Sequence, residues 1–174
     1  MDTKALAASA ATVVRAQVKP GDIHSYGLKL LKLNGFTIGQ SIDITYAKGE
    51  TRFFALDAEQ KWFYFDPSPG SIPAARLVFG IYSVGQITAA TVCEREKTAE
   101  FKTKNSLGVS SAGTVRRRSL GVQITMDGPA LPALHIQCLP YTAVGNGEYL
   151  SRLAAAQRIV TLLQNALALS RRAT

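Results

Sequence analysis

The 174-residue chain is 47% apolar and 18% charged, and its formal net charge is +8. A chain of this length buries about two-thirds of the surface of its unfolded state, which suits one domain with or without an appended helix and is too little for two full domains. The apolar content excludes a chain that is disordered as a whole.

The positive charge is concentrated in the second half of the chain. Residues 1–90 carry nine basic and seven acidic side chains, a net charge of +2, whereas residues 91–174 carry eleven and five, a net charge of +6. A basic surface favours an anionic partner, either nucleic acid or an acidic protein surface, without requiring one.

Cysteine usage and hydropathy predict a cytoplasmic protein. Cys93 and Cys138 lie far apart and form no CxxC pair, which argues against a structural zinc site. The start of the chain lacks a charged segment followed by a long apolar core, so we expect no signal peptide and reduced thiols. The most apolar stretch, residues 72–93, is interrupted by Pro73, Arg76 and Gln86, so we expect no membrane span.

Two amphipathic helices are predicted before residue 36. Asp2 or Thr3 can cap the first, which runs to about Val18, and the same residues are also compatible with a frayed tail. Asp22 can cap the second, and Asn34-Gly35 ends it as a left-handed cap. Apolar residues of the second helix recur at helical spacing, at Ile23, Tyr26, Leu30 and Leu33. Both helices need a surface on which to pack.

An aromatic hairpin follows. Residues 52–57 and 61–65 are rich in Phe, Trp and Tyr, and they flank the turn residues 58–60. Side chains alternate between the two faces along a strand, so Phe53 and Phe54 lie on different faces, as do Phe63 and Tyr64. The hairpin is therefore apolar on both faces. A sheet with one face in water would not need this pattern, and we therefore predict that the N-terminal helices cover the second face.

Further strands are predicted at residues 77–82, 86–94, 120–126 and 134–138. The last two alternate apolar and polar residues on either side of the turn signal Asp127-Gly128-Pro129, and they form the clearest hairpin in the chain. We interpret the charged residues 95–101 as a hairpin turn and the small polar residues 108–113 as a loop of low order.

The last segment is predicted to be a long helix that packs on the sheet. It begins at Asn146 or Gly147, and its apolar residues follow spacings of three and four over about five turns. This stripe consists of Tyr149, Leu153, Ala156, Val160, Leu163 and Leu167.

Four segments in this order resemble a known family. They are the Asn34-Gly35-Phe36 turn after a helix, the strand Phe54-Ala55-Leu56-Asp57 with its partner strand 61–65, the segment 82–92 with Gln86-Ile87, and the terminal helix. Together they are similar to the uncharacterised bacterial pleckstrin-homology-like proteins over residues 30–168. Gln86 stands where that family has an acidic residue, and Cys93 stands where it has another.

The resemblance implies an α+β fold with a pleckstrin-homology-like antiparallel curved sheet or partly open barrel and a long C-terminal helix. We expect residues 1–35 to form an N-terminal helical segment that packs on the sheet, and residues 36–174 to form the pleckstrin-homology-like domain with its C-terminal helix. The resemblance implies little about function, because such folds present binding surfaces of many kinds.

No catalytic, cofactor-binding or metal-binding residues are predicted. A nucleophilic triad needs a base, and His24 and His135 are the two histidines of the chain. His135 and Cys138 are three residues apart in a predicted strand, which places Cys138 in the core and His135 in solvent. Turns and strand ends explain three carboxylates near the aromatic hairpin: Asp57, Glu59 and Asp66.

The most distinctive charged feature is the run Arg116, Arg117 and Arg118. With Lys102 and Lys104 it forms the candidate partner-binding site, since these side chains can contact phosphates or an acidic protein surface. The alternative interpretation is a solvated strand edge or loop that resists aggregation. Aromatic residues for stacking on single-stranded bases lie elsewhere, at residues 53–65.

We therefore predict a non-enzymatic binding or scaffolding module that recognises a protein partner or another copy of itself. The doubly apolar hairpin, the stripe of the terminal helix and the missing catalytic set support this prediction. The alternative function is nucleic-acid binding through the three arginines. We expect no cofactor and no small-molecule substrate.

Overall fold

The structure is a computed structural model that describes residues 11–45, 51–67, 77–127, 133–142 and 146–172. Two helices and eight strands lie in these ranges, joined in places by short 3-10 turns. In chain order they are β1 (Ala11–Ala16), η1 (Pro20–Asp22), α2 (Ile23–Leu33), β2 (Ile38–Thr45), β3 (Thr51–Asp57), β4 (Trp62–Phe65), β5 (Leu77–Ser83), η3 (Val84–Gln86), β6 (Ile87–Lys104), β7 (Ser110–Met126), β8 (Ala133–Thr142) and α3 (Asn146–Arg172).

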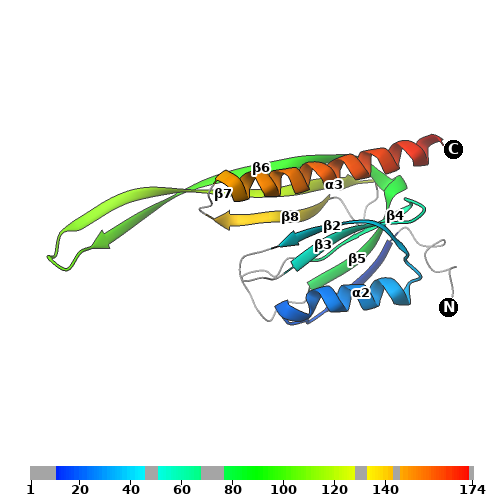
Figure 1. The fold of residues 1–174 in the computed structure, drawn as a ribbon, viewed down its shortest axis with the longest axis horizontal. Helices are drawn as coiled ribbons and strands as arrows, with labels where there is room; N and C mark the ends of the chain where they lie inside the picture. Colours follow the sequence, from blue (N-terminus) through cyan, green and yellow to red (C-terminus); the bar gives the residue numbers. More distant parts are fainter. Residues whose placement is uncertain (1–10, 46–50, 68–76, 128–132, 143–145, 173–174) are drawn as a thin grey trace.

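The strands form two antiparallel sheets (Figure 1). One has five strands in the order β1-β5-β4-β3-β2, and the other has three in the order β6-β7-β8. The sheets do not close into a barrel, and the long helix α3 lies along the three-stranded sheet. The α+β class and the C-terminal helix predicted from the sequence are therefore confirmed.

The aromatic hairpin β3–β4 lies inside the five-stranded sheet and is buried on both faces. Phe53 and Tyr64 point to the face that α2 covers, whereas Phe54 and Phe63 point to the main core. From α2, the apolar side chains of Ile23, Leu30 and Leu31 fill the first of these faces. The prediction that an N-terminal helix covers the second face of the hairpin is confirmed for α2.

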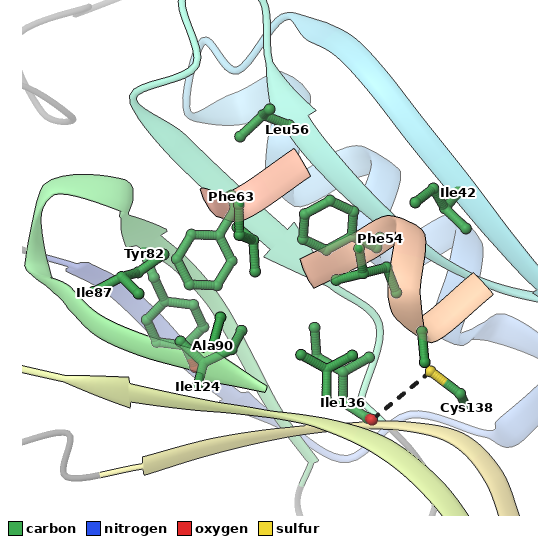
Figure 2. Packing of buried hydrophobic residues seen from close by; sticks show 14 of the residues in the cluster. Ile42, Phe54, Leu56, Phe63, Tyr82, Ile87, Ala90, Ile124, Ile136 and Cys138 are labelled. Atoms are coloured by element: carbon green, nitrogen blue, oxygen red, sulfur yellow. Dashed lines mark hydrogen bonds between the residues drawn. The ribbon is translucent and has the colours of Figure 1, made fainter. Parts of the chain in front are cut away.

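The main core lies between the two sheets and α3 (Figure 2). The five-stranded sheet contributes Ile42, Phe54 and Phe63, and the three-stranded sheet contributes residues such as Ile124 and Ile136. The helix α3 closes this core with four fully buried side chains at helical spacing, Ala156, Ile159, Leu163 and Ala166. Each large apolar side chain buried in this way stabilises the fold by roughly 1.5–3 kcal/mol.

The first predicted helix is wrong where the structure describes it. Residues 11–16 form β1, an edge strand antiparallel to β5. Thr12, Val13 and Val14 are β-branched and favour a strand, and Val14 and Ala16 pack against the core beneath α2. Residues 1–10 lie outside the described ranges. Within those ranges one short α-helix, rather than two, precedes the aromatic hairpin, and the predicted segment 1–35 supplies both a strand and a helix to the sheet.

The predicted turn at residues 95–101 is also wrong, and the predicted loop at residues 108–113 is wrong beyond residues 108 and 109. β6 and β7 pair from Ile87 with Met126 to Lys104 with Ser110, with a register shift between Ile87 and Ala89. Their turn lies at residues 105–109, where the Asn105 side-chain oxygen accepts the backbone N–H groups of Leu107 (3.0 Å) and Val109 (2.9 Å). The described side chains from Glu94 to Lys104 are exposed on both faces of the strand, so the charged residues there show no apolar period.

Candidate functional site

The β6–β7 hairpin extends beyond the sheet that contains it. β8 pairs with β7 only as far as Arg118, which lies opposite Thr142. Past this point residues 97–104 and 110–117 continue as a two-stranded ribbon of eight paired positions, roughly 26 Å long at the usual rise per residue. We call residues 97–117 the arm and the rest of the described molecule the body. Figure 1 shows the arm projecting well beyond the end of the body.

The arm is basic along its length and apolar at its tip. Its 21 residues include five basic side chains and one acidic side chain, a net charge of +4. At the turn, Leu107 is 86% exposed and Val109 is 60% exposed. A two-stranded hairpin with no core beneath it is marginally stable in water by itself. The arm therefore depends on the pairing of its two strands more than on burial of its described side chains.

β6 is an edge strand of the three-stranded sheet, and it is 18 residues long. Most strands have 3–10 residues, and edge strands are usually shorter because their outer N–H and C=O groups can pair with another chain. The described side chains of β6 in the arm are all exposed, at Thr98, Glu100, Lys102, Thr103 and Lys104. This edge is a template for the addition of a strand.

A hollow of about 470 Å³ lies where the arm leaves the body. It is lined by Glu94, Arg95, Glu96, Arg118 and Tyr149. The Tyr149 hydroxyl donates a hydrogen bond to Glu94, and the Arg118 guanidinium lies 5.1 Å from the centre of the Tyr149 ring. These contacts fasten the base of the arm to the first turn of α3.

The structure places the five predicted site residues on the arm and at its base without gathering them in one cluster. Arg116, Arg117 and Arg118 lie opposite Thr98, Lys97 and Glu96 in the β6–β7 register. Arg117 and Arg118 are exposed, and as neighbours in a strand they face opposite sides.

Lys102 and Lys104 lie close to the tip of the arm, opposite Ala112 and Ser110. Lys102 is six positions along β6 from the residue that faces Arg118, a separation of roughly 20 Å. The positive charge is therefore distributed along the arm.

Sequence reasoning missed the arm and the roles of Glu94 and Tyr149. One signal for the arm was present, because Asn105 and Gly108 can form a turn between two stretches of equal length. Gly108 has a φ of 77° there, in the left-handed region that favours glycine. The contact between Tyr149 and Glu94 joins residues 55 positions apart and has no local signal.

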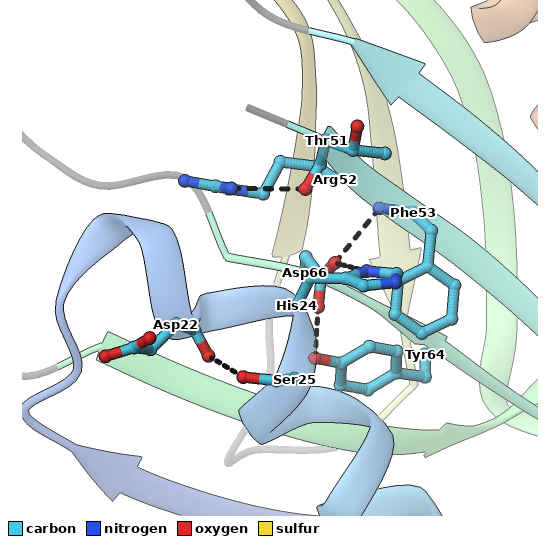
Figure 3. Close-up of polar contacts among 8 residues, drawn as sticks. All are labelled: Asp22, His24, Ser25, Thr51, Arg52, Phe53, Tyr64 and Asp66. Atoms are coloured by element: carbon cyan, nitrogen blue, oxygen red, sulfur yellow. Dashed lines mark hydrogen bonds and ion pairs between the residues drawn. The ribbon is translucent and has the colours of Figure 1, made fainter. Parts of the chain in front are cut away.

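A second polar cluster surrounds Asp66, which is 5% exposed at the end of β4 (Figure 3). One carboxylate oxygen accepts the Tyr64 hydroxyl at 2.6 Å. The other accepts the backbone N–H of Phe53 at 3.0 Å and lies 3.2 Å from Nδ1 of His24. Burial raises the pKa of Asp66, and the hydrogen bonds from Tyr64, Phe53 and His24 act in the opposite direction.

The Asp66 cluster ties α2 to the sheet. Gly27 of α2 lies so close that a Cβ atom there would be 2.1 Å from the Tyr64 hydroxyl oxygen and 2.7 Å from an Asp66 carboxylate oxygen. His24 and Asp66 form an oriented pair of the kind that serves a nucleophile, but Cys138 belongs to the other core cluster. Burial raises the pKa of Cys138 to about 12, which suppresses its thiolate.

Cys138, His135 and Asp57 lie as the sequence predicts. Cys138 is fully buried and His135 is exposed, as expected. Asp57 serves the β3–β4 turn, because its carboxylate accepts the backbone N–H groups of Lys61 (2.7 Å) and Trp62 (2.9 Å). In the described ranges, no group of three or more His, Cys, Asp and Glu side chains is arranged to hold a metal ion.

The fold and the arm define an α+β protein with two antiparallel sheets, a long C-terminal helix and a projecting two-stranded arm. Comparison of the chain with protein-family models, curated proteins and solved structures finds no match. Among the described residues, neither helix combines the length and apolar character needed to cross a membrane.

Proposed function

We propose that this protein is a non-enzymatic binding or scaffolding module that recognises a protein partner through its arm. The observation that carries the proposal is the projecting β6–β7 ribbon, with its 18-residue edge strand and its exposed Leu107 and Val109. Eight paired positions beyond the core add little to the stability of the fold, which points to a role in binding.

The arm suits recognition by strand addition. In this mode the backbone of an edge strand supplies hydrogen bonds, and alternate side chains supply specificity. The base of the arm is fastened by Glu94, Arg118 and Tyr149, so the ribbon leaves the body in a defined direction. A fixed direction lowers the ordering cost of binding.

Shortening the arm tests this function. Lys97 and Arg117 lie directly opposite each other, so residues 98–116 can be replaced by an Asn-Gly turn without disturbing the body. We expect light scattering to show an oligomer of the full chain, or a partner found by affinity capture and then purified to bind it. We expect the shortened chain to lose that self-association or binding. A full chain that stays monomeric and binds no protein through the arm would contradict the proposal.

Nucleic-acid binding is the second candidate function, and the net charge of +4 on the arm favours it. Arg117 in the arm and Arg118 at its base face opposite sides, so this part of the hairpin can contact phosphates on both sides. We expect fluorescence anisotropy with a labelled duplex or single strand to show binding that weakens steeply with salt. Replacement of Arg116, Arg117 and Arg118 by Ala should reduce it. Binding that ignores both salt and these substitutions excludes this candidate.

We also propose that the fold is pleckstrin-homology-like and that the protein acts in the cytoplasm. Support for the fold comes from the left-handed Gly35 after α2, the adjacent strands β3 and β4, and the terminal helix on antiparallel sheets. The free thiols of Cys93 and Cys138 are compatible with a reducing compartment. Cell fractionation tests the location, and recovery of the chain with membranes would contradict it.

A further inference from the structure

The charge on one face of β6 changes sign along the strand. Alternate residues share a face, and the face that carries Ala90 and Val92 in the body continues into the arm. Its exposed residues are acidic near the body and basic near the tip, in the order Glu94, Glu96, Thr98, Glu100, Lys102 and Lys104. Charged residues in any order would protect an edge strand from pairing with other chains, so protection does not explain this segregation of acidic and basic residues.

This order is self-complementary when two copies of β6 lie antiparallel. A two-fold axis at Ala99 places each residue opposite the one equally far on the other side of Ala99. Glu94 of each copy then lies opposite Lys104 of the other, and Glu96 opposite Lys102. The two copies together form four opposite-charge pairs and no like-charge pair on this face, since Thr98 lies opposite Glu100. Opposite-charge pairs across strands are stabilising.

Neighbouring registers lack this complementarity. An axis at Thr98 places Glu96 opposite Glu100, and an axis at Glu100 places the two Glu100 side chains opposite each other. Like charges directly across strands are destabilising. The other strand of the arm offers no alternative, because residues 110–117 contain only Arg116 and Arg117 as charged residues. The charges therefore select one strand and one register.

We propose that the partner of the arm is a second copy of this chain, which pairs antiparallel along β6 with the two-fold axis at Ala99. The pairing joins the two three-stranded sheets into one sheet in the order β8-β7-β6-β6-β7-β8 and adds backbone hydrogen bonds along both arms. It also brings the exposed Leu107 of each copy to the level of Thr91 of the other, beside the body. This inference rests on the proposed function, because it names the partner of the same arm.

Charge exchange tests the register in the full chain. Sedimentation equilibrium should give the mass of two chains for the natural sequence. Glu96→Lys alone and Lys102→Glu alone each turn two opposite-charge pairs into like-charge pairs, and each should raise the dissociation constant about tenfold. The double variant Glu96→Lys/Lys102→Glu restores both pairs and should return the constant to its original value. A mixture of the two single variants should form the mixed dimer.

A matched control carries the same charge change outside the pairs. Glu100→Lys lies on the same face of β6 as Glu96→Lys, but its opposite residue is the uncharged Thr98. Its dissociation constant should stay within about twofold of the original, since an uncharged neighbour gives no direct pair to reverse.

A cysteine at the axis tests the geometry independently. In a Cys93→Ala background, Ala99→Cys should form a disulfide between two copies under mild oxidation, because directly opposite residues on antiparallel strands lie within disulfide reach. Ser111→Cys in the same background lies on the exposed face of the other strand and should remain reduced in dilute solution.

The outcomes separate this inference from the proposed function. A chain that stays monomeric but binds another protein through its arm overturns the inference and leaves the proposed function standing. A chain that binds nothing through its arm overturns both. A dimer that ignores every charge variant and forms no Ala99→Cys disulfide also overturns the inference, because another surface then holds it together.

Discussion

The body and the arm share the strands β6 and β7, yet opposite forces shape the two regions. Within the body, Ala90 and Val92 of β6 face apolar side chains from the opposite sheet and from α3. From Glu94 onward, the same face of the same strand is charged and exposed. Burial stabilises the first part of the hairpin, whereas strand pairing and exposed polar contacts, such as that of Thr103 with Ser111, hold the second. Stability therefore resides in the body, and we propose that recognition resides in the arm.

The largest expected effect is the loss of an aromatic side chain from the centre of the body. Phe54 is fully buried between the sheets, and Phe54→Ala should lower the free energy of unfolding by about 3–5 kcal/mol through lost burial and a cavity. Chemical denaturation measures it. Thr98→Ala, in the arm, is the matched contrast and should change stability by no more than about 0.5 kcal/mol. Equal effects at both positions would break the comparison.

A smaller loss is expected where α2 touches the sheet. Gly27→Ala forces a Cβ atom against the Tyr64 hydroxyl and should cost about 1–3 kcal/mol by overpacking. Gly21→Ala meets no atom within 4 Å and should be nearly neutral. Removal of the hydroxyl by Tyr64→Phe should make Gly27→Ala less costly. Additive effects in this double-mutant cycle would show that the close approach is not the cause.

The buried Asp66 predicts a pH dependence of stability. Burial raises its pKa above 3.8 in the folded state, so the folded protein binds a proton more readily than the unfolded chain does. The contribution of Asp66 to stability is thus most favourable below pH 3.8 and declines as the pH rises through the folded-state value. The difference in unfolding free energy between the natural sequence and Asp66→Asn should follow this decline.

Two charged or titratable neighbours of Asp66 bear on that measurement. His24 contacts the carboxylate directly, so repeating the comparison in a His24→Asn background tests whether this contact contributes. The charge of Arg52 acts on Tyr64, whose hydroxyl donates a hydrogen bond to Asp66. If the unfolding free energy of the natural sequence, relative to that of Asp66→Asn, increased as the pH rises, the predicted sign would be contradicted.

The smallest effect is expected from shortening the arm. Removal of residues 98–116 deletes no member of either core cluster, so the free energy of unfolding should change by less than about 1 kcal/mol. Denaturation at low protein concentration, where self-association does not contribute, measures this change. A loss as large as that of Phe54→Ala would mean that the arm belongs to the folding unit.

Much of the body was predictable because its signals are local. Phe53 and Phe54 on opposite faces of one strand indicated a sheet covered on both sides, and the stripe that includes Ala156 and Leu163 indicated the packed face of α3. The prediction failed at β1, because a short run with Val13 and Val14 suits either a helix or a strand until a neighbouring edge such as β5 is available.

The arm was not predictable to the same degree. Charged residues at 94–104 carry no apolar period, so periodicity could not separate a strand in solvent from a turn. The residues of the candidate site were named individually from their charge, but their spacing depends on the register of β6 with β7. That register places Lys102 near the tip and Arg118 beside Tyr149.

The sequence by itself determined the α+β class, the doubly apolar hairpin and the terminal helix, because burial imposes a period on residues that are neighbours in the chain. Only the tertiary structure decided that β1 completes the five-stranded sheet and that β6 and β7 extend beyond the end of β8 to form the arm. Those outcomes depend on where distant strands begin and end against each other, and no local pattern encodes the length of a partner strand.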